Sequence, residues 1–176
     1  MKLDTRRFSL RTLDKGSVPK EYYSWIQDPL ITRYLEIYPR HYQEIDAEKY
    51  IESHDKRSSF FIGIYTKDGK FIGTHSLKGS SRTRKFSIGG LVGVREYWGH
   101  NVIMETRAAL LTFGFKRLEH QKAEAGCYVG NSSAIYNFLR QGWKKEGVLR
   151  SHRTIEGVGE DLILFGLLKD EWKENN

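Results

Sequence analysis

Two segments of the chain place backbone and side-chain groups where a ligand could bind. The first, residues 88–118, predicts a strand, a turn and then a helix, with the turn running through Trp98-Gly99-His100-Asn101. A turn that leads into a helix N-terminus directs several free backbone N–H groups, and the positive end of the helix dipole, at one point. Such a point binds phosphate without any side chain, so the chemistry indicated is recognition of a phosphate-bearing ligand.

Asn131 is the second candidate. It follows a predicted strand over residues 123–129 and precedes a predicted helix over residues 132–140. Asn at such a position commonly caps the helix through its side-chain oxygen. A residue at the carboxyl end of a sheet strand can instead face a ligand crevice. Both interpretations stay open at this point.

Alternating apolar residues and turn residues predict the elements that precede these segments. A strand over residues 8–13 is followed by short helices, and a longer helix begins at Asp46 as a possible N-cap. Two strands flank an Asp68-Gly69 turn and form a hairpin, and a third strand runs from about Phe86 to Val94. The predicted helix after Asp46 has one apolar stripe: Ala47, Tyr50, Ile51 and His54.

The remaining elements complete one α/β or α+β domain. After the third strand the apolar period becomes that of a helix, followed by the strand and helix around Asn131 and by two strands between Trp143 and Leu168. This order predicts a mixed sheet with helices packed on it. The expected buried face of the helix is Met104, Ala108, Leu111, Phe115 and Leu118.

Composition limits the class of protein and its partners. The 176 residues fit one domain, and 29 Lys and Arg against 22 Asp and Glu give a net charge of +7, which favours an anionic partner. The single cysteine, Cys127, excludes an internal disulfide and a Cys-rich zinc cluster. No run approaches the ~18 apolar residues of a membrane span, and the N-terminal residues do not read as a signal peptide. We therefore expect a cytoplasmic protein without metal or membrane contact.

The segment from Trp98 to Glu105 resembles the acyl-CoA loop of the GNAT superfamily of N-acetyltransferases, which reads Trp-Gly-Lys-Gly. Within that superfamily the chain is most similar to the Rim-type branch, which includes ribosomal-protein N-terminal acetyltransferases. Asn131 precedes Gly142 by eleven positions, as Asn precedes Gly-Phe in that branch. Further matches, in chain order, are Trp25–Pro29, Glu146–Arg150, Gly157–Asp161 and Glu171-Trp172.

The resemblance implies a single GNAT domain over residues 1–176, with a central, mostly antiparallel twisted sheet whose middle strands splay apart. It implies acetyl-CoA as cosubstrate and a primary amine as acceptor, on a protein N-terminus or on a small molecule such as an amino-sugar nucleotide. The implied cofactor-binding groups include the backbone of Leu91, Val92 and Val94 for the pantetheine arm. The others are Gly99, His100, Asn101, Val102, Ile103 and Met104 for the pyrophosphate, with Asn131 and Phe138 beside them.

Two residues of the loop depart from the family pattern. Asn101 stands where the family has glycine, and Asn is the next most tolerant residue for left-handed backbone, so we expect Asn101 to keep that conformation. Ile103 stands where a small residue is usual, and its bulk predicts weaker pyrophosphate binding.

Catalytic groups are few. Ala134 and Phe138 stand where family members carry a Ser or Tyr acid, and Ser87 stands where a carboxylate is frequent. Amine acetylation needs a group that takes a proton, and His75 is one candidate because histidine titrates near neutral pH. The other candidates are Tyr128, which could instead form the cleft wall, Asp161, which could instead recognise the amine or pair structurally, and Glu96 at the rim of the loop.

Three functions are therefore compared. The first is direct acetyl transfer from acetyl-CoA to a primary amine, by a protein that could be a homodimer. The alternative is a catalytically impaired GNAT-fold binding or regulatory protein, suggested by the departures at Asn101, Ile103, Ser87, Ala134 and Phe138. A nucleic-acid binder is disfavoured, because the basic residues are scattered and no helix-turn-helix, zinc or RNP-like motif is present.

Overall fold

A computed structural model describes residues 1–36, 43–155 and 157–173. One eight-stranded sheet runs through them in the order β1-β2-β3-β4-β5-β6-β8-β7. Every neighbouring pair of strands is antiparallel except β5 and β6. The predicted mixed, mostly antiparallel sheet is confirmed. The strands are β1 (Lys2–Asp4), β2 (Phe8–Thr12), β3 (Ser59–Thr66), β4 (Phe71–Ser80), β5 (Lys85–Val92), β6 (Lys122–Tyr128), β7 (Lys144–Ile155) and β8 (Val158–Leu168).

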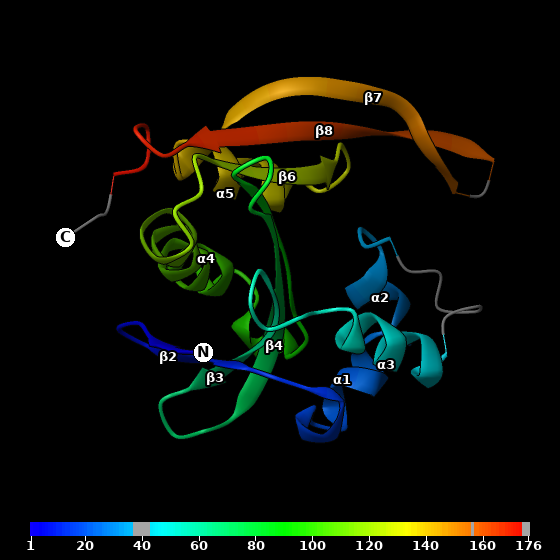
Figure 1. Ribbon diagram of the computed structural model, residues 1–176. Coiled ribbons are helices and arrows are strands. Elements are labelled where there is room, and N and C mark those ends of the chain that lie inside the picture. The colour runs from blue at the N-terminus through cyan, green and yellow to red at the C-terminus, as the bar shows by residue number, and fades with distance from the viewer. Residues whose placement is uncertain (37–42, 156, 174–176) are drawn as a thin grey trace.

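Helices cover both faces of the sheet. In Figure 1, α4 and α5 lie on one side of the central strands and α1, α2 and α3 gather on the other, while β7 and β8 form a long pair along one end. Each helical layer has its own core, one including Leu110, Leu111 and Phe138, the other Trp25, Ala47 and Ile51. The helices are α1 (Glu21–Trp25), α2 (Pro29–Thr32), α3 (Glu44–Glu52), α4 (Val102–Thr112), which continues in a π-helical turn over Phe113–Arg117, and α5 (Ser132–Arg140).

The two central strands separate in the middle of the sheet. β5 and β6 pair only over Lys85–Ser87 and Lys122–Glu124. β6 continues to Tyr128 along β8, and β5 continues to Val92 along β4. The expected splayed middle strands are therefore confirmed, and the edge of β5 beyond Ser87 is left open towards β6.

Two predicted helix details are wrong. The longer helix of the first layer begins one turn earlier than expected, with Gln43 as N-cap and Asp46 at the third position, where its carboxylate accepts the Gln43 N–H at 3.0 Å. The sequence Gln43-x-x-Asp46 is a reciprocal capping arrangement in which the acidic residue is the later member. His54 lies beyond the end of this helix, although it is buried beside Tyr50.

The buried face of α4 is also rotated from the predicted one. Only Leu111 and Phe115 of the predicted stripe are fully buried, and Met104 and Ala108 are partly exposed. The helix packs on the sheet through a face that carries two polar residues, which an apolar stripe cannot reveal. The residues buried on α4 itself are Val102, Thr106, Arg107, Leu110 and Leu111.

Candidate active site

A cleft of about 610 Å³ opens where β5 and β6 separate. Its walls come from the open edge of β5, the N-terminus of α4 and the first half of α5. Leu30 and Ile31 of α2, with Tyr34 and Leu35 after it, form the remaining wall. The splay of the sheet thus creates a channel that connects a helix N-terminus with the carboxyl end of β6.

The backbone direction along β5 decides which groups face this channel. The Gly93 N–H donates to the Ile72 carbonyl at 2.9 Å, and successive backbone groups of a strand point to opposite edges. Leu91 therefore points its backbone groups at β4, whereas Gly90 and Val92 point theirs at the open edge. The Val94 N–H and carbonyl are bonded to Ile72 and Tyr97.

Of the three residues expected to pair with a pantetheine arm, only Val92 keeps a backbone group directed at the cleft. The backbone of Leu91 faces β4 and that of Val94 is bonded to Ile72 and Tyr97, so these contacts do not support either residue as a backbone partner, and that assignment stays a prediction. The Val92 carbonyl accepts the Trp98 indole N–H at 2.8 Å, which ties the following loop to the strand. Gly90 is a cleft-facing residue that the sequence did not single out.

The turn before α4 has the conformation expected from its residues. Asn101 is left-handed, with φ 58° and ψ 22°, and α4 begins at the next residue, Val102. The first N–H groups of a helix have no partner within it, so those of Val102, Ile103 and Met104 are directed out of the helix end beside the cleft. The expectation that Asn101 adopts the left-handed conformation is confirmed.

Ion pairing holds this helix end in place. Glu105 accepts from the Thr5 hydroxyl and from the Arg7 side chain, each at 2.7 Å, and Arg7 also donates to the His100 carbonyl at 2.9 Å. Burial raises the pKa of Glu105, but its bonds to Thr5 and Arg7 outweigh burial and lower it overall. Because the negative charge of Glu105 is balanced by Arg7, the helix end keeps its positive character.

Ile103 directs its side chain into the protein. Its Cδ1 lies 3.3 Å from the position that a Cβ on Gly90 would occupy, and the side chain packs against the core below β5. It also lines the cleft. The bulk expected near a pyrophosphate therefore lies on the β5 side of the helix end.

His75, a candidate base, is fully buried beneath β5. Its Nδ1 lies 2.9 Å from the Gly89 carbonyl and its Nε2 lies 2.8 Å from the Thr106 hydroxyl. Because a carbonyl can only accept, Nδ1 carries the proton in the neutral ring. Burial lowers the pKa of His75 to about 4. The expectation that His75 titrates near neutral pH is wrong, and its contacts are those of a residue that joins β5 to α4.

Arg107 is a second residue of the cleft that the sequence did not single out. It is only 3% exposed, yet it lines the cleft from α4. Its Nε donates to Gln141 Oε1 at 2.5 Å, its Nη2 donates to the Asn137 carbonyl at 3.0 Å, and its guanidinium lies 4.1 Å from the centre of the Phe138 ring. Burial lowers the pKa of Arg107 to about 9, so the side chain is a cation at neutral pH.

Asn131 caps a helix, as predicted, and lies at the cleft. Its side-chain oxygen accepts the Ala134 N–H at 3.1 Å, so it caps α5, and it also lines the cleft. Cys127 lies in the same wall, and burial raises the pKa of its thiol to about 11. A thiol of that kind is protonated at neutral pH and is inert as a nucleophile. Phe138 lines the cleft without a hydroxyl group.

The other proton-transfer candidates lie apart from the cleft. The Tyr128 hydroxyl donates to Glu36, and its ring lies under the Arg153 guanidinium at 3.5 Å. Asp161 accepts the Ser151 N–H at 2.8 Å, in the irregular part of β7. Neither residue lines the cleft, and the second interpretation of Asp161, structural pairing, matches its contact. Glu96 pairs with Lys70 on the surface.

Arg153 connects the β7–β8 pair with the wall after α2. It is 8% exposed and bonds to Glu160 at 2.6 Å, to the Arg33 carbonyl at 2.7 Å and to the Leu35 carbonyl at 3.1 Å. Tyr34 and Leu35 line the cleft. This arginine therefore holds one wall of the cleft against the sheet.

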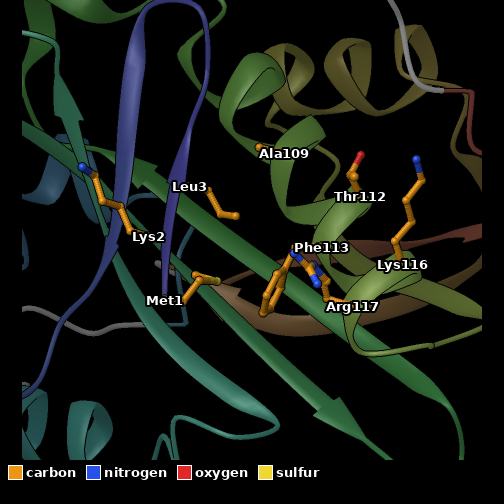
Figure 2. A pocket seen from close by; sticks show the side chains of 8 residues that line it. All are labelled: Met1, Lys2, Leu3, Ala109, Thr112, Phe113, Lys116 and Arg117. Carbon is orange, nitrogen blue, oxygen red and sulfur yellow. The ribbon is translucent and has the colours of Figure 1, made fainter.

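A second hollow, of about 460 Å³, lies between β1 and the end of α4 (Figure 2). Its lining is apolar near Leu3, Ala109 and Phe113, with basic side chains from Lys2, Lys116 and Arg117 at its rim. None of the candidate catalytic or cofactor-binding residues named above lines it.

Within the described ranges, no three His, Cys, Asp or Glu side chains are grouped so that they could hold a metal ion. No helix of that part of the chain is both long enough and apolar enough to cross a membrane.

The chain matches a known protein family. A family model described as an acetyltransferase (GNAT) domain matches residues 7–144. The "Uncharacterized N-acetyltransferase p20" of Bacillus licheniformis is 28% identical over an alignment 179 residues long, which covers 97% of each chain. Two solved structures share the fold. RimL, a ribosomal L7/L12 alpha-N-protein acetyltransferase in complex with coenzyme A, has a TM-score of 0.83 at 16% identity, over 97% of this chain and 99% of its own. Spermidine N-acetyltransferase from Vibrio cholerae, in complex with CoA and spermine, has a TM-score of 0.82 at 18% identity, over 93% and 96%.

Proposed function

The chain belongs to the GNAT family of N-acetyltransferases, and we propose that it moves the acetyl group of acetyl-CoA directly onto a primary amine. The observation that carries the proposal is the single cleft that joins the N-terminus of α4 to the open edge of β5 and to Asn131. A donor with a phosphate end and an extended arm needs those two features side by side.

The residues present fit acetyl-CoA. Three outward N–H groups, from Val102, Ile103 and Met104, and the helix dipole would hold the pyrophosphate. The backbone groups of Gly90 and the N–H of Val92, which point to the open edge, would hold the pantetheine arm in the manner of an added strand. Bound there, acetyl-CoA supplies an activated acyl group. Only glycine fits at position 90, because a Cβ there would lie 2.5 Å from the His75 ring.

The protonation chemistry follows from what lines the cleft. None of the described lining residues is an Asp or Glu, and His75 is neutral and engaged at both nitrogens. With no carboxylate among the described lining residues, we propose that the amine loses its proton to water, before or during attack. This predicts a rate that rises with pH as the ammonium group of the acceptor loses its proton.

The acceptor would enter along the wall formed by Leu30, Ile31, Tyr34 and Leu35. A small amine is one candidate class, since spermidine N-acetyltransferase shares the fold. A protein N-terminus is the other, since RimL also shares it. The apolar and aromatic character of the wall is suited to an uncharged amine with apolar neighbours.

Two measurements test the proposed function. Titration calorimetry should show acetyl-CoA binding to the purified protein, and release of free CoA thiol should depend on an added amine. The acceptor panel comprises spermidine, peptides with free N-termini and an amino-sugar nucleotide. Absence of acetyl-CoA binding at millimolar concentration would contradict the proposal, and binding without turnover on any amine would support the impaired-protein alternative.

Replacing Asn101 with aspartate should weaken acetyl-CoA binding about tenfold, which corresponds to ~1.4 kcal/mol. Aspartate has the same shape and tolerates left-handed backbone, but it places a negative charge beside the pyrophosphate site. Binding is measured by titration calorimetry. Asn101→Gly is the matched control, because it keeps the loop conformation without the charge and should bind as the wild type does. If Asn101→Asp and Asn101→Gly bind acetyl-CoA with equal affinity, the phosphates do not bind beside Asn101.

A further inference from the structure

Arg107 is a buried cation, and none of the described residues that line its cleft is an Asp or a Glu. In the described part of the chain no carboxylate forms an ion pair with it, and its two hydrogen-bond acceptors, Gln141 Oε1 and the Asn137 carbonyl, are neutral. A guanidinium carries five N–H donors, so three remain beyond these two bonds. Burying an unpaired charge is costly, and an anion that approached the guanidinium would offset that cost.

The guanidinium is held rigidly. Gln141, which accepts from Arg107, donates its own amide N–H to the Met104 carbonyl at 2.9 Å, so the pair is bonded to both α4 and α5. The Phe138 ring packs on the guanidinium on one side and stacks on Phe165 at 4.8 Å. A charge fixed in advance at one place stabilises a charge that develops during a reaction better than a mobile one does.

The position of Arg107 is chemically informative. It contacts Phe138, the residue that stands where the family resemblance places a tyrosine acid, and Ala134 supplies no hydroxyl either. A departing thiolate in this cleft therefore meets no oxygen acid from those two positions. Arg107, beside Phe138, is a cation that can lower the energy of the thiolate instead.

Resting on the proposed function, we propose that Arg107 stabilises the CoA thiolate that leaves during acetyl transfer, in place of a proton-donating hydroxyl. In that step the bond that forms joins the amine nitrogen to the acetyl carbon, and the bond that breaks is C–S. The electron pair leaves on sulfur, where the guanidinium meets it. The proton of the amine passes to water, and the thiolate takes up a proton from solvent.

The test measures the pKa of the thiol of bound CoA, a quantity that an activity assay does not report. The ultraviolet absorbance of the thiolate is recorded against pH for free CoA and for CoA bound to wild-type protein. The variants are Arg107→Met, which keeps the length and apolar packing, and Arg107→Lys, which keeps the charge. An opposite charge at close range lowers a pKa by about 1–3 units, so the thiol bound to wild type should ionise at lower pH than free CoA.

With Arg107→Met, the pKa of the bound thiol should return to the value in free CoA or rise above it, and Arg107→Lys should restore part of the decrease. The kcat of Arg107→Met should be about 100-fold lower, with little change in the KM for the amine. If Arg107→Met does not fold, wild type alone decides, because a bound thiol that titrates as in free CoA overturns the proposal.

Two other outcomes also overturn it. Much tighter binding of succinyl-CoA than of acetyl-CoA, lost in Arg107→Met, would show that the guanidinium serves a carboxylate on the acyl chain. Failure of the wild type to bind CoA at all overturns the proposed function together with this inference, whereas binding with an unshifted thiol overturns this inference alone.

Discussion

Replacing Arg153 with methionine is expected to lower the free energy of unfolding by about 3–5 kcal/mol and to raise the KM for the amine acceptor. The arginine side chain is 6% exposed and its partner, Glu160, is 19% exposed. Removing one member of such a pair leaves the other charge buried without compensation. The measurement is urea denaturation, together with steady-state kinetics in which amine and acetyl-CoA are varied separately.

The effect on the acceptor follows from what the arginine holds. The carbonyls of Arg33 and Leu35 lose their donors at the same time as Glu160 loses its cation. Tyr34, between them, and Leu35 form the wall that the acceptor would follow. The groups proposed to hold acetyl-CoA come from β5 and the N-terminus of α4 rather than from this wall, so the affinity for acetyl-CoA should be close to that of wild type.

The matched control is Arg150→Met, on the same strand. Arg150 is exposed, and the described residues give it no ion-pair partner, so this variant should change stability by less than about 0.5 kcal/mol. If Arg153→Met and Arg150→Met unfold at the same urea concentration, the clamp between the β7–β8 pair and the wall after α2 does not stabilise the protein.

The parts of this structure that the sequence predicts well are local ones. The Asp68-Gly69 hairpin, the left-handed turn at Asn101 and the cap at Asn131 each depend on a few consecutive residues whose backbone preferences agree. The splay of β5 from β6 was expected from the family resemblance instead. It required matching motifs over the whole chain, because no local pattern shows where two strands separate.

The parts that the sequence does not predict depend on distant partners. His75 meets Thr106 across 31 positions, and Arg153 meets the Arg33 and Leu35 carbonyls across 120 and 118 positions. Arg107 was missed for a related reason. The buried face of α4 includes Thr106 and Arg107, and small alanines on the next face are compatible with either orientation. Only the packing of α4 on the sheet and on α5 decides which face is buried.

His75 should make the protein sensitive to acid, and replacing it with glutamine should remove most of that sensitivity. The pKa of His75 is about 4 in the folded protein because of burial, against a usual value of 6.5. Between those pH values the unfolded chain binds a proton that the folded protein does not, so stability falls as pH decreases. Across the whole window the loss amounts to about 3 kcal/mol.

The measurement is urea denaturation at several pH values between about 4 and 7. At neutral pH His75→Gln should be about 1 kcal/mol less stable than wild type, because one of two hydrogen bonds is lost. The stability of His75→Gln should decline much less on acidification than that of wild type. Plots of stability against pH for the two proteins should therefore converge or cross. His54 and His120, whose pKa values burial also lowers, are present in both proteins and cancel from the comparison.

His152→Gln is the matched control, because His152 is exposed on β7 and its removal should leave the acid dependence of wild type. The same variants separate the structural role of His75 from a catalytic one. A residue that joins β5 to α4 can be replaced by glutamine without changing the shape of the pH–rate profile, whereas loss of a general base flattens that profile. A flattened profile in His75→Gln, with the acid dependence of stability unchanged, would assign His75 to proton transfer and contradict the buried, neutral state described above.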